Sequence, residues 1–208
     1  MNEDIFQNRY IEHQDRKKRT LEIDDGEECF IDYDIINFLD IVYSRRSQRI
    51  FNNKEIGEIE LNTLIDSIVD APSSCNRQAI SVKILNDLSE MDLLVGGFGW
   101  AKKAKIAMLL FANMDAYKSP NEREFMPYLD AGFVGQNLYL TAEAMGLGAC
   151  FINPNIREEN KERFSELYNK ENLKFCGAMV FGHYDKKAPR PPKRNRNEAI
   201  IHTGNNNI

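Results

Sequence analysis

The sequence predicts one domain that combines helices with a buried β-sheet. Its 208 residues are enough for a single hydrophobic core. Apolar residues at i, i+3, i+4 and i+7 between Ile35 and Val42 predict an amphipathic helix. The apolar run from Ile106 to Phe111 is typical of a strand covered on both faces of its sheet. With an ordinary apolar content of 42%, these patterns indicate a globular α+β protein.

Charge and composition exclude several classes of protein. The net charge of −5 argues against a dedicated nucleic-acid-binding protein. No apolar run is long enough to cross a bilayer, and residues 1–4 lack the features of a signal peptide, so we expect a cytoplasmic protein without a membrane partner. The four cysteines are scattered and the three histidines lack a second ligand at helical spacing, so we expect no metal. The sequence contains no Gly-x-Ser-x-Gly motif, so it gives no indication of a serine hydrolase.

The first third of the chain predicts an extension followed by two helices. Residues 1–33 are polar and charged, which leaves open whether they form a helix that packs on a partner subunit or are partly disordered. Asp34 is a candidate N-cap, so the domain is expected to span residues 34–208. A second apolar stripe over residues 61–69 predicts a helix that ends before Pro72.

The rest of the chain alternates strands, helices and loops. We expect strands at Ser81–Leu85, Lys105–Ala112, Ala149–Ile152 and Cys176–Gly182. We expect helices at Tyr128–Met145, buried and stopped by Gly146, and at Ile156–Lys170, with Phe164, Leu167 and Tyr168 facing inward. The Gly-rich segment 95–100 either brings its backbone close to a ligand or is simply a loop. The polar segment Asn113–Pro127 is a candidate substrate lid.

The stretch from Arg45 to Arg49 is the densest cluster of donors. It places three guanidinium groups and the Ser47 hydroxyl within five residues, a combination that suits a phosphate. Two plainer interpretations remain open: a solvated surface run, and cations that complement the dipole at the end of the preceding helix.

Four motifs follow one another in a fixed order. Arg45–Phe51 reads Arg-x-Ser-x-Arg-x-Phe, and Ala71–Gln78 reads Ala-Pro-Ser-x-x-Asn-x-Gln. The third runs from Asp130 to Cys150, and the fourth comprises Gly182 and Pro191–Arg194. Together they make the chain similar to the nitroreductase family of FMN-dependent oxidoreductases over about Ile35 to Ile201. The resemblance implies a mixed central sheet flanked by helices, non-covalently bound FMN, and a domain-entwined homodimer with active sites at its interface.

The resemblance also implies which residues bind the cofactor. Arg45, Arg46 and Ser47 would hold the phosphate and ribityl chain, joined by the C-terminal pair Lys193 and Arg194. Arg49 would lie near flavin N1 and O2, where a fixed cation favours the negative charge of the reduced flavin. The partner subunit would cover the ring with Pro72, Ser73, Ser74 and Asn76, and Ile152 and Asn153 complete the predicted set. For the basic tail, a solvated run or a non-specific RNA patch remains an alternative.

Two departures from the family pattern affect the chemistry. Asn153-Pro154 stands where many members have a Glu-Gly or similar pair that offers backbone N–H groups to N5 and O4, and proline has none, so that bond is missing or rerouted through Asn153 or Asn155. Ala79-Ile80 follows Gln78 where the family usually has proline and an aromatic residue, which makes the substrate class less predictable.

The function implied is an FMN-dependent NAD(P)H oxidoreductase. Hydride from NAD(P)H would reach flavin N5, and a nitroaromatic, quinone or similar acceptor would then be reduced by a ping-pong mechanism, with no catalytic side chain required. A flavin-dependent relative with other chemistry, such as dehalogenation, flavin fragmentation or azoline dehydrogenation, is one alternative. A flavin- or nucleotide-binding module without turnover is another.

Overall fold

A computed structural model describes residues 38–95, 99–170 and 172–199. The chain divides into two units, Met1–Ser44 and Arg45–Ile208. Within the described part of the first unit, residues 38–44 are helical, which agrees with the apolar periodicity there. The expected extension and the Asp34 N-cap lie outside the described residues, so the boundary at residue 34 stays a prediction.

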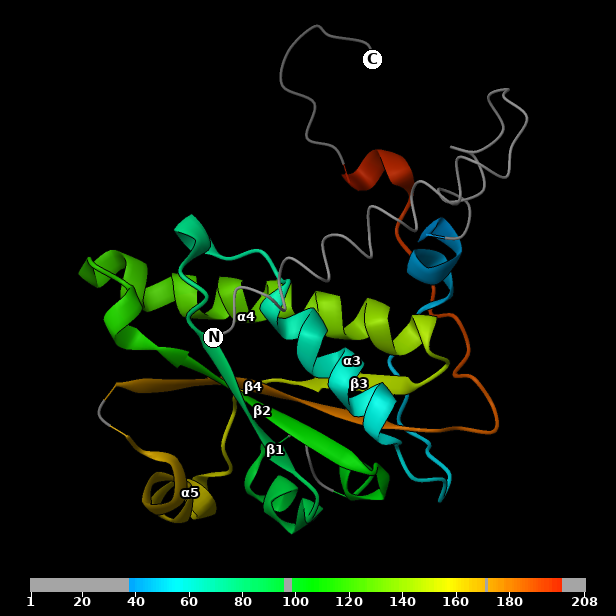
Figure 1. Ribbon diagram of the computed structural model, residues 1–208, viewed down its shortest axis with the longest axis horizontal. Helices are drawn as coiled ribbons and strands as arrows, with labels where there is room; N and C mark the ends of the chain where they lie inside the picture. The colour runs from blue at the N-terminus through cyan, green and yellow to red at the C-terminus, as the bar shows by residue number, and fades with distance from the viewer. Residues whose placement is uncertain (1–37, 96–98, 171, 200–208) are drawn as a thin grey trace, which may run out of the picture. The chain divides into compact units, whose positions relative to one another are not determined.

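The second unit is built on a four-stranded sheet with the order β1-β2-β4-β3, and each neighbouring pair is antiparallel (Figure 1). A parallel element is added where Ser47 forms an isolated bridge with Ala149, at the outer edge of β3. The α+β class is thus confirmed, and the parallel direction expected in a mixed sheet is limited to this bridge. The strands are β1 Ile80–Leu85, β2 Ile106–Asn113, β3 Gly148–Ile152 and β4 Leu173–Gly182.

Strand β4 begins three residues before the predicted start at Cys176. Leu110 of β2 pairs with Gly177 and Phe111 pairs with Phe175, so Cys176 is the extra residue of a β-bulge. Gly177 has a φ of +132°, and a Cβ there would lie 2.5 Å from the ring of Phe151. The bulge therefore needs glycine, and it interrupts the alternation by which sequence patterns reveal a strand.

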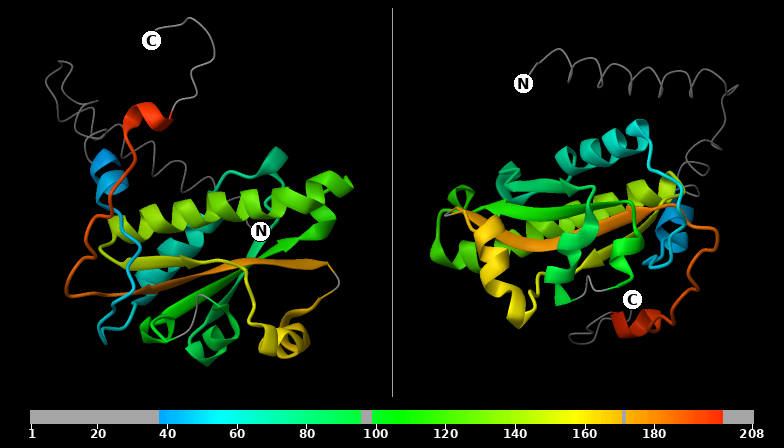
Figure 2. Two further views of the ribbon diagram at one scale, coloured as in Figure 1. Left: turned by 180° about the vertical axis from the view of Figure 1, so that it is seen from behind. Right: turned by 90° about the horizontal axis from the view of Figure 1, so that it is seen from below.

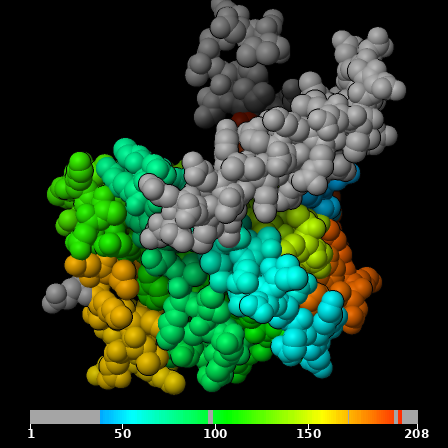
Figure 3. Space-filling view, viewed as in Figure 1, coloured from blue at the N-terminus to red at the C-terminus, as the bar shows by residue number. Residues whose placement is uncertain are grey.

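Helices cover both faces of the sheet (Figures 1 and 2). The helices α3, Glu58–Val69, and α4, Pro120–Ala144, pack on one face, and α3 lies at the surface in Figure 3. The helix α5, Lys161–Tyr168, and the 3-10 turns at Leu88–Leu93 and Ala101–Lys103 cover the other face. The described residues include no helix of the length and apolar content needed to span a membrane. Shorter 3-10 turns occupy Ser74–Asn76, Met114–Ala116, Glu158–Asn160 and Arg196–Ala199.

The loop predicted over Asn113–Pro127 is shorter than expected, because α4 already starts at Pro120, and a lid role for the segment stays a prediction. Ser119 and Glu122 form a capping box at its N-terminus, and proline is well suited to the first helical position. Pro127 lies inside the helix, where it cannot donate to the carbonyl of Arg123. Lys174 Nζ approaches that carbonyl oxygen at 3.4 Å, which compensates for the missing donor, so Pro127 does not end the helix.

Of two further helix predictions, one needs correction and the other is confirmed. The helix expected over Ile156–Lys170 is only the eight residues of α5 preceded by a 3-10 turn. Phe164 and Tyr168 are buried as expected, but Leu167 is 47% exposed, because so short a helix packs through one narrow stripe. The stop at Gly146 is confirmed: its φ is +73°, and Leu147 N–H donates to Ala142 O at 2.8 Å, as in a Schellman motif.

Candidate functional site

The Arg45–Arg49 motif is attached by its backbone to the edge of β3. Ser47 pairs with Ala149, and Gln48 N–H donates to Ala149 O at 2.9 Å. An edge strand presents unpaired N–H and C=O groups, so this pairing both satisfies β3 and fixes the position of the motif.

Gln48, which the sequence analysis assigned no role, anchors this segment. It is only 2% exposed, and its Nε2 donates to Ile50 O at 2.7 Å and to Lys186 O at 3.0 Å. Its Oε1 accepts from Ala188 N–H at 2.8 Å, so one side chain joins the motif to the segment after β4. A Cβ at Gly148 would lie 2.6 Å from Gln48 Cγ, which explains the glycine there. No pattern in the sequence marks Gln48, because its burial and its backbone partners appear only in the fold.

Tyr139 of α4 contacts two of the predicted phosphate-binding residues. Its hydroxyl lies 3.2 Å from Ser47 Oγ and accepts a 2.7 Å hydrogen bond from Phe151 N–H. The guanidinium carbon of Arg45 lies 4.7 Å from the centre of its ring, within cation–π range. Burial raises the pKa of the Tyr139 hydroxyl, so the group stays protonated at neutral pH.

The other two arginines of the motif have different surroundings. Arg46 Nη1 donates to Arg45 O at 2.7 Å. Arg49 is exposed, with its guanidinium carbon 5.6 Å from the ring centre of Trp100. Burial raises the pKa of the Cys150 thiol on β3, and the charge of Arg49 opposes that shift. Among the described residues, neither Arg45 nor Arg49 forms an ion pair, so their charge is not neutralised there by a carboxylate.

The second motif forms the loop from Pro72 to Gln78, which leads into β1 and is held by a buried carboxylate. Asp130 of α4 is fully buried, and its two oxygens accept from Ser74 N–H at 2.9 Å and from Tyr117 O–H at 2.9 Å. Ser73 Oγ closes the loop by accepting from Gln78 N–H at 2.9 Å. Desolvation and the hydrogen bond to Asp130 raise the pKa of Tyr117, which keeps this donor protonated.

An ion pair and an unusual backbone complete the loop. Arg77 pairs with Glu122 of α4 at 2.9 Å and also donates to Ser74 Oγ at 3.2 Å. The hydrogen bond with Arg77, and backbone donors at Ser119 and Lys118, hold the pKa of the Glu122 carboxyl below its ordinary value. The loop is also strained: left-handed φ values of 51°, 53° and 49° occur at Cys75, Asn76 and Gln78, none of them glycine.

Within one chain the two motifs lie at opposite edges of the sheet. The Arg45–Arg49 motif borders β3, whereas the Pro72–Gln78 loop enters β1, and β2 and β4 lie between them. Three strand spacings amount to roughly 14 Å. The side chains that anchor them, Asp130 and Tyr139, are nine residues apart on α4, or about 13.5 Å along the helix axis. One chain therefore does not bring the two halves of the predicted site together.

Ile152 and Asn153 lie at the end of β3, the strand whose Ala149 pairs with Ser47. Ile152 is the last residue of β3 and is 2% exposed, and Asn153 follows it. Asn153 Oδ1 accepts from Asn155 N–H at 3.0 Å, which closes a turn around Pro154. The Asn155 N–H, one of the two rerouted donors considered for the flavin, is therefore already engaged within the chain.

Lys193 and Arg194 are exposed on the arm that leaves the sheet after β4 (Figure 1). Arg194 Nη1 lies 3.5 Å from Glu198 O, so its recorded contact is within the arm. Closer to the sheet, Gln48 holds the arm through residues 186 and 188, and Lys187 pairs with Glu143 of α4. The arm thus starts beside the Arg45–Arg49 motif, but the structure does not bring its basic pair into contact with Arg45.

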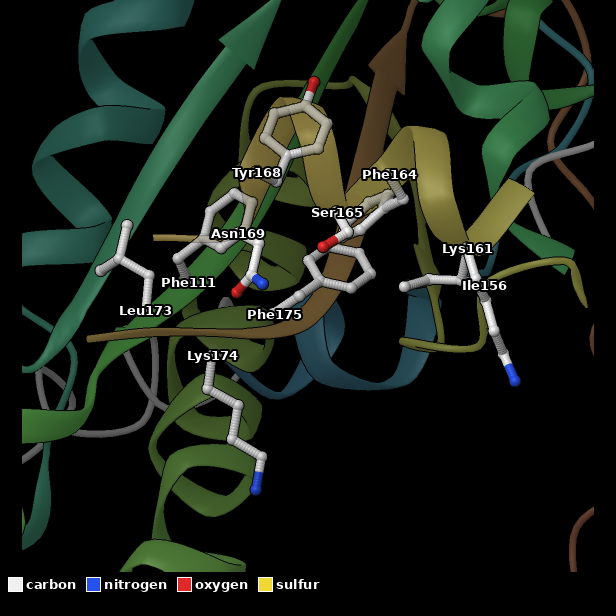
Figure 4. A pocket seen from close by; sticks show the side chains of 10 residues that line it. All are labelled: Phe111, Ile156, Lys161, Phe164, Ser165, Tyr168, Asn169, Leu173, Lys174 and Phe175. Atoms are coloured by element: carbon white, nitrogen blue, oxygen red, sulfur yellow. The ribbon is translucent and has the colours of Figure 1, made fainter. Parts of the chain in front are cut away.

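A separate pocket of about 300 Å³ lies on the α5 side of the sheet (Figure 4). Four aromatic side chains line it with ring centres 4.9 to 5.6 Å apart: Phe111, Phe164, Tyr168 and Phe175. Lys161 and Lys174 border the pocket, but their ammonium groups point away from the rings (Figure 4). None of the predicted cofactor residues lines this pocket, so we assign it to packing. The part of the chain that the structure describes holds no cluster of three potential metal ligands.

Comparison with known proteins agrees with this architecture. Residues 95–183 match a family model described as Nitroreductase family. The chain is 26% identical over 192 residues to the FMN reductase (NADPH) of Bacillus subtilis strain 168, covering 83% of this chain and 75% of the relative.

Solved structures share the fold. Nitroreductase A from Vibrio parahaemolyticus superposes with a TM-score of 0.71 at 22% identity, covering 83% of this chain and 77% of that one. A protein from Desulfovibrio desulfuricans, described as a nitroreductase and solved with FMN, gives a TM-score of 0.70 at 20% identity. The match covers 80% of this chain and 96% of that one. The chain therefore has the nitroreductase fold. Its resemblance to the nitroreductase family, predicted from four motifs, is confirmed.

Proposed function

We propose that this protein is an FMN-dependent oxidoreductase that uses NAD(P)H. The observation that carries the proposal is the Arg45–Arg49 motif on the edge of β3, where Arg45 and Ser47 converge on Tyr139 and neither Arg45 nor Arg49 is paired with a described carboxylate. A relative named FMN reductase (NADPH) and a structural neighbour solved with FMN support the choice of cofactor.

The residues present fit the phosphate end of FMN better than its ring. Arg45, Arg46 and Ser47 would hold the phosphate and ribityl chain, because guanidinium and hydroxyl groups donate to phosphate oxygens. Arg49 would place its positive charge near N1 and O2. At the N5 side, Pro154 has no N–H and that of Asn155 is engaged, so Asn153 is the remaining candidate donor of the Asn153–Asn155 turn.

When bound, FMN would take hydride from NAD(P)H at N5 and pass the electrons to a nitroaromatic, a quinone or a similar acceptor in a ping-pong sequence. The side chains contribute binding, orientation and a cation at the developing negative charge, and none needs to act as a nucleophile. The departures at Asn153-Pro154 and Ala79-Ile80 concern contacts to the ring and its substrate, so they affect the choice of acceptor rather than retention of the cofactor.

We further propose that the protein is a homodimer whose active sites lie at the subunit interface. The two halves of the site are on opposite sheet edges, so Pro72, Ser73, Ser74 and Asn76 would reach the flavin of a partner. An apolar stripe on α4 offers a surface for that partner: Phe125, Leu129 and Phe133 are 55%, 47% and 38% exposed. Gly132 lies beside them, and a Cβ built there meets nothing within 4 Å, which leaves room for a second backbone.

The first test is the visible absorption spectrum of the purified protein, before and after denaturation. Flavin bands and release of FMN, followed by oxidation of NADH or NADPH when a quinone is added, are expected. A protein that binds FMN but oxidises neither NADH nor NADPH would contradict the proposal that NAD(P)H is the reductant. A protein that takes up no FMN would contradict the proposal that FMN is the cofactor. For the dimer, Phe133→Glu should halve the mass measured by sedimentation, whereas Phe133→Leu should leave it unchanged.

A further inference from the structure

The hydroxyl of Tyr139 joins three elements of the fold at one oxygen atom. It is reached by Phe151 N–H of β3 at 2.7 Å and by Ser47 Oγ of the Arg45–Arg49 motif at 3.2 Å, while Tyr139 itself belongs to α4. In the sequence, Tyr139 is one tyrosine in an apolar helix, and such a residue is most simply explained as part of the core.

The donors available set the direction of one of these two hydrogen bonds. Phe151 N–H can only donate, so the Tyr139 oxygen must accept from it. Either hydroxyl can then donate in the pair of Tyr139 and Ser47, and one of the two arrangements has Tyr139 donating to Ser47 Oγ. Once Ser47 Oγ accepts, its own hydrogen points away from Tyr139. The serine is left as a donor, and donors in such a chain polarise one another.

The ring of Tyr139 orients a second group. Arg45 lies over its face at 4.7 Å, which restricts the guanidinium without using any of its N–H groups. One side chain therefore directs both a hydroxyl hydrogen and a cation, and the two share a preference for anionic oxygen.

We infer that Tyr139 is a positioning residue that turns Ser47 into a hydrogen-bond donor and holds Arg45 for a phosphate monoester. This rests on the proposed function, in which that monoester is the phosphate of FMN. The role is specific for the phosphate: it predicts an effect on FMN and none on riboflavin, which has the same ring and ribityl chain but no phosphate.

The test is a binding comparison with full-length protein stripped of flavin and reloaded. Tyr139→Phe removes the hydroxyl and keeps the ring beneath Arg45. Its Kd for FMN, from quenching of flavin fluorescence, should rise about fivefold, the size expected for one hydrogen bond. Its Kd for riboflavin should not change. Tyr168→Phe is the matched control, because the Tyr168 hydroxyl is also hydrogen-bonded, to Lys83, but Tyr168 is buried on the other face of the sheet.

A double-mutant cycle identifies the path of the effect. If Tyr139 acts through Ser47, adding Tyr139→Phe to Ser47→Ala should not weaken FMN binding further. Equal weakening of FMN and riboflavin would show a merely structural role and overturn the inference, as would an unchanged Kd for FMN in Tyr139→Phe. Wild-type protein that binds no FMN would overturn the proposed function and this inference together, a result distinct from the other two.

Discussion

At Asp130, α4 holds the Pro72–Gln78 loop through a buried charge, whereas at Tyr139 it holds the Arg45–Arg49 motif through neutral hydroxyl groups. In the loop, charged side chains serve as anchors, and the residues proposed to face the flavin ring are neutral. In the motif, the anchors Gln48 and Tyr139 are neutral, and neither Arg45 nor Arg49 is paired with a described carboxylate.

The difference follows from what each half must leave available. A charge used internally by an ion pair has little attraction left for a ligand, so a phosphate-binding motif is best fixed by groups that carry no net charge. A loop that covers a ring system needs shape more than charge, so a buried carboxylate can hold it. Five substitutions test this contrast, from the largest expected effect to the smallest.

Asp130→Ala should have the largest effect on stability. It leaves two buried donors, Ser74 N–H and Tyr117 O–H, without their acceptor, and a loss of about 3 kcal/mol in the free energy of unfolding is expected. Urea denaturation at fixed protein concentration measures it. The exposed Asp70→Ala is the control and should change stability by less than about 0.5 kcal/mol. Equal effects of the two substitutions would refute the anchoring role of Asp130.

Gln48→Ala should lower the free energy of unfolding by about 2 kcal/mol, because it removes three buried hydrogen bonds to backbone groups. The loss should be local to the start of the C-terminal arm. Hydrogen exchange at the Ala188 amide should therefore accelerate, while exchange in the centre of β2 changes only as global stability does. A protected Ala188 amide in the variant would show that Gln48 does not hold the arm.

Arg45→Ala should weaken FMN binding about tenfold, which corresponds to about 1.4 kcal/mol, with little effect on stability. Arg49→Ala should leave FMN bound but lower its reduction potential, because the cation near N1 and O2 is lost. Retention through gel filtration and a redox titration distinguish the two. An Arg45→Ala protein that keeps its full complement of FMN would contradict the phosphate assignment.

Glu122→Gln should have the smallest effect, and that effect should depend on pH. Because the pKa of Glu122 is lowered on folding, its stabilisation is present above the usual glutamate range and is lost as the pH falls through the folded value. Glutamine keeps the capping box but not the charge. The urea midpoints of variant and wild type should differ at neutral pH and converge in acid. A constant difference across that range would show that the charge of Glu122 is not involved.

The sequence predicted the elements whose signals are local. The apolar run of β2, the stripe of α3 and the glycine after α4 each depend on side chains close together in the chain, so period and turn chemistry were sufficient. It failed at Pro127, taken as a loop residue, because the compensating donor is Lys174, about fifty positions away. At Pro120 the signal was local, the capping box of Ser119 and Glu122, and was not used. It also missed the start of β4, because the bulge at Cys176 breaks the alternation of the strand.

The composition of the candidate site was determined by the sequence alone: three arginines and a serine in five residues, and a loop rich in serine and asparagine. Only the tertiary structure decided how they are used. Packing on α4 selected Tyr139 and Asp130 as anchors, and strand order placed the two motifs on opposite edges of one sheet. The physical reason is that hydrogen-bond direction, burial and strand neighbours depend on contacts between residues far apart in sequence, which no local pattern records.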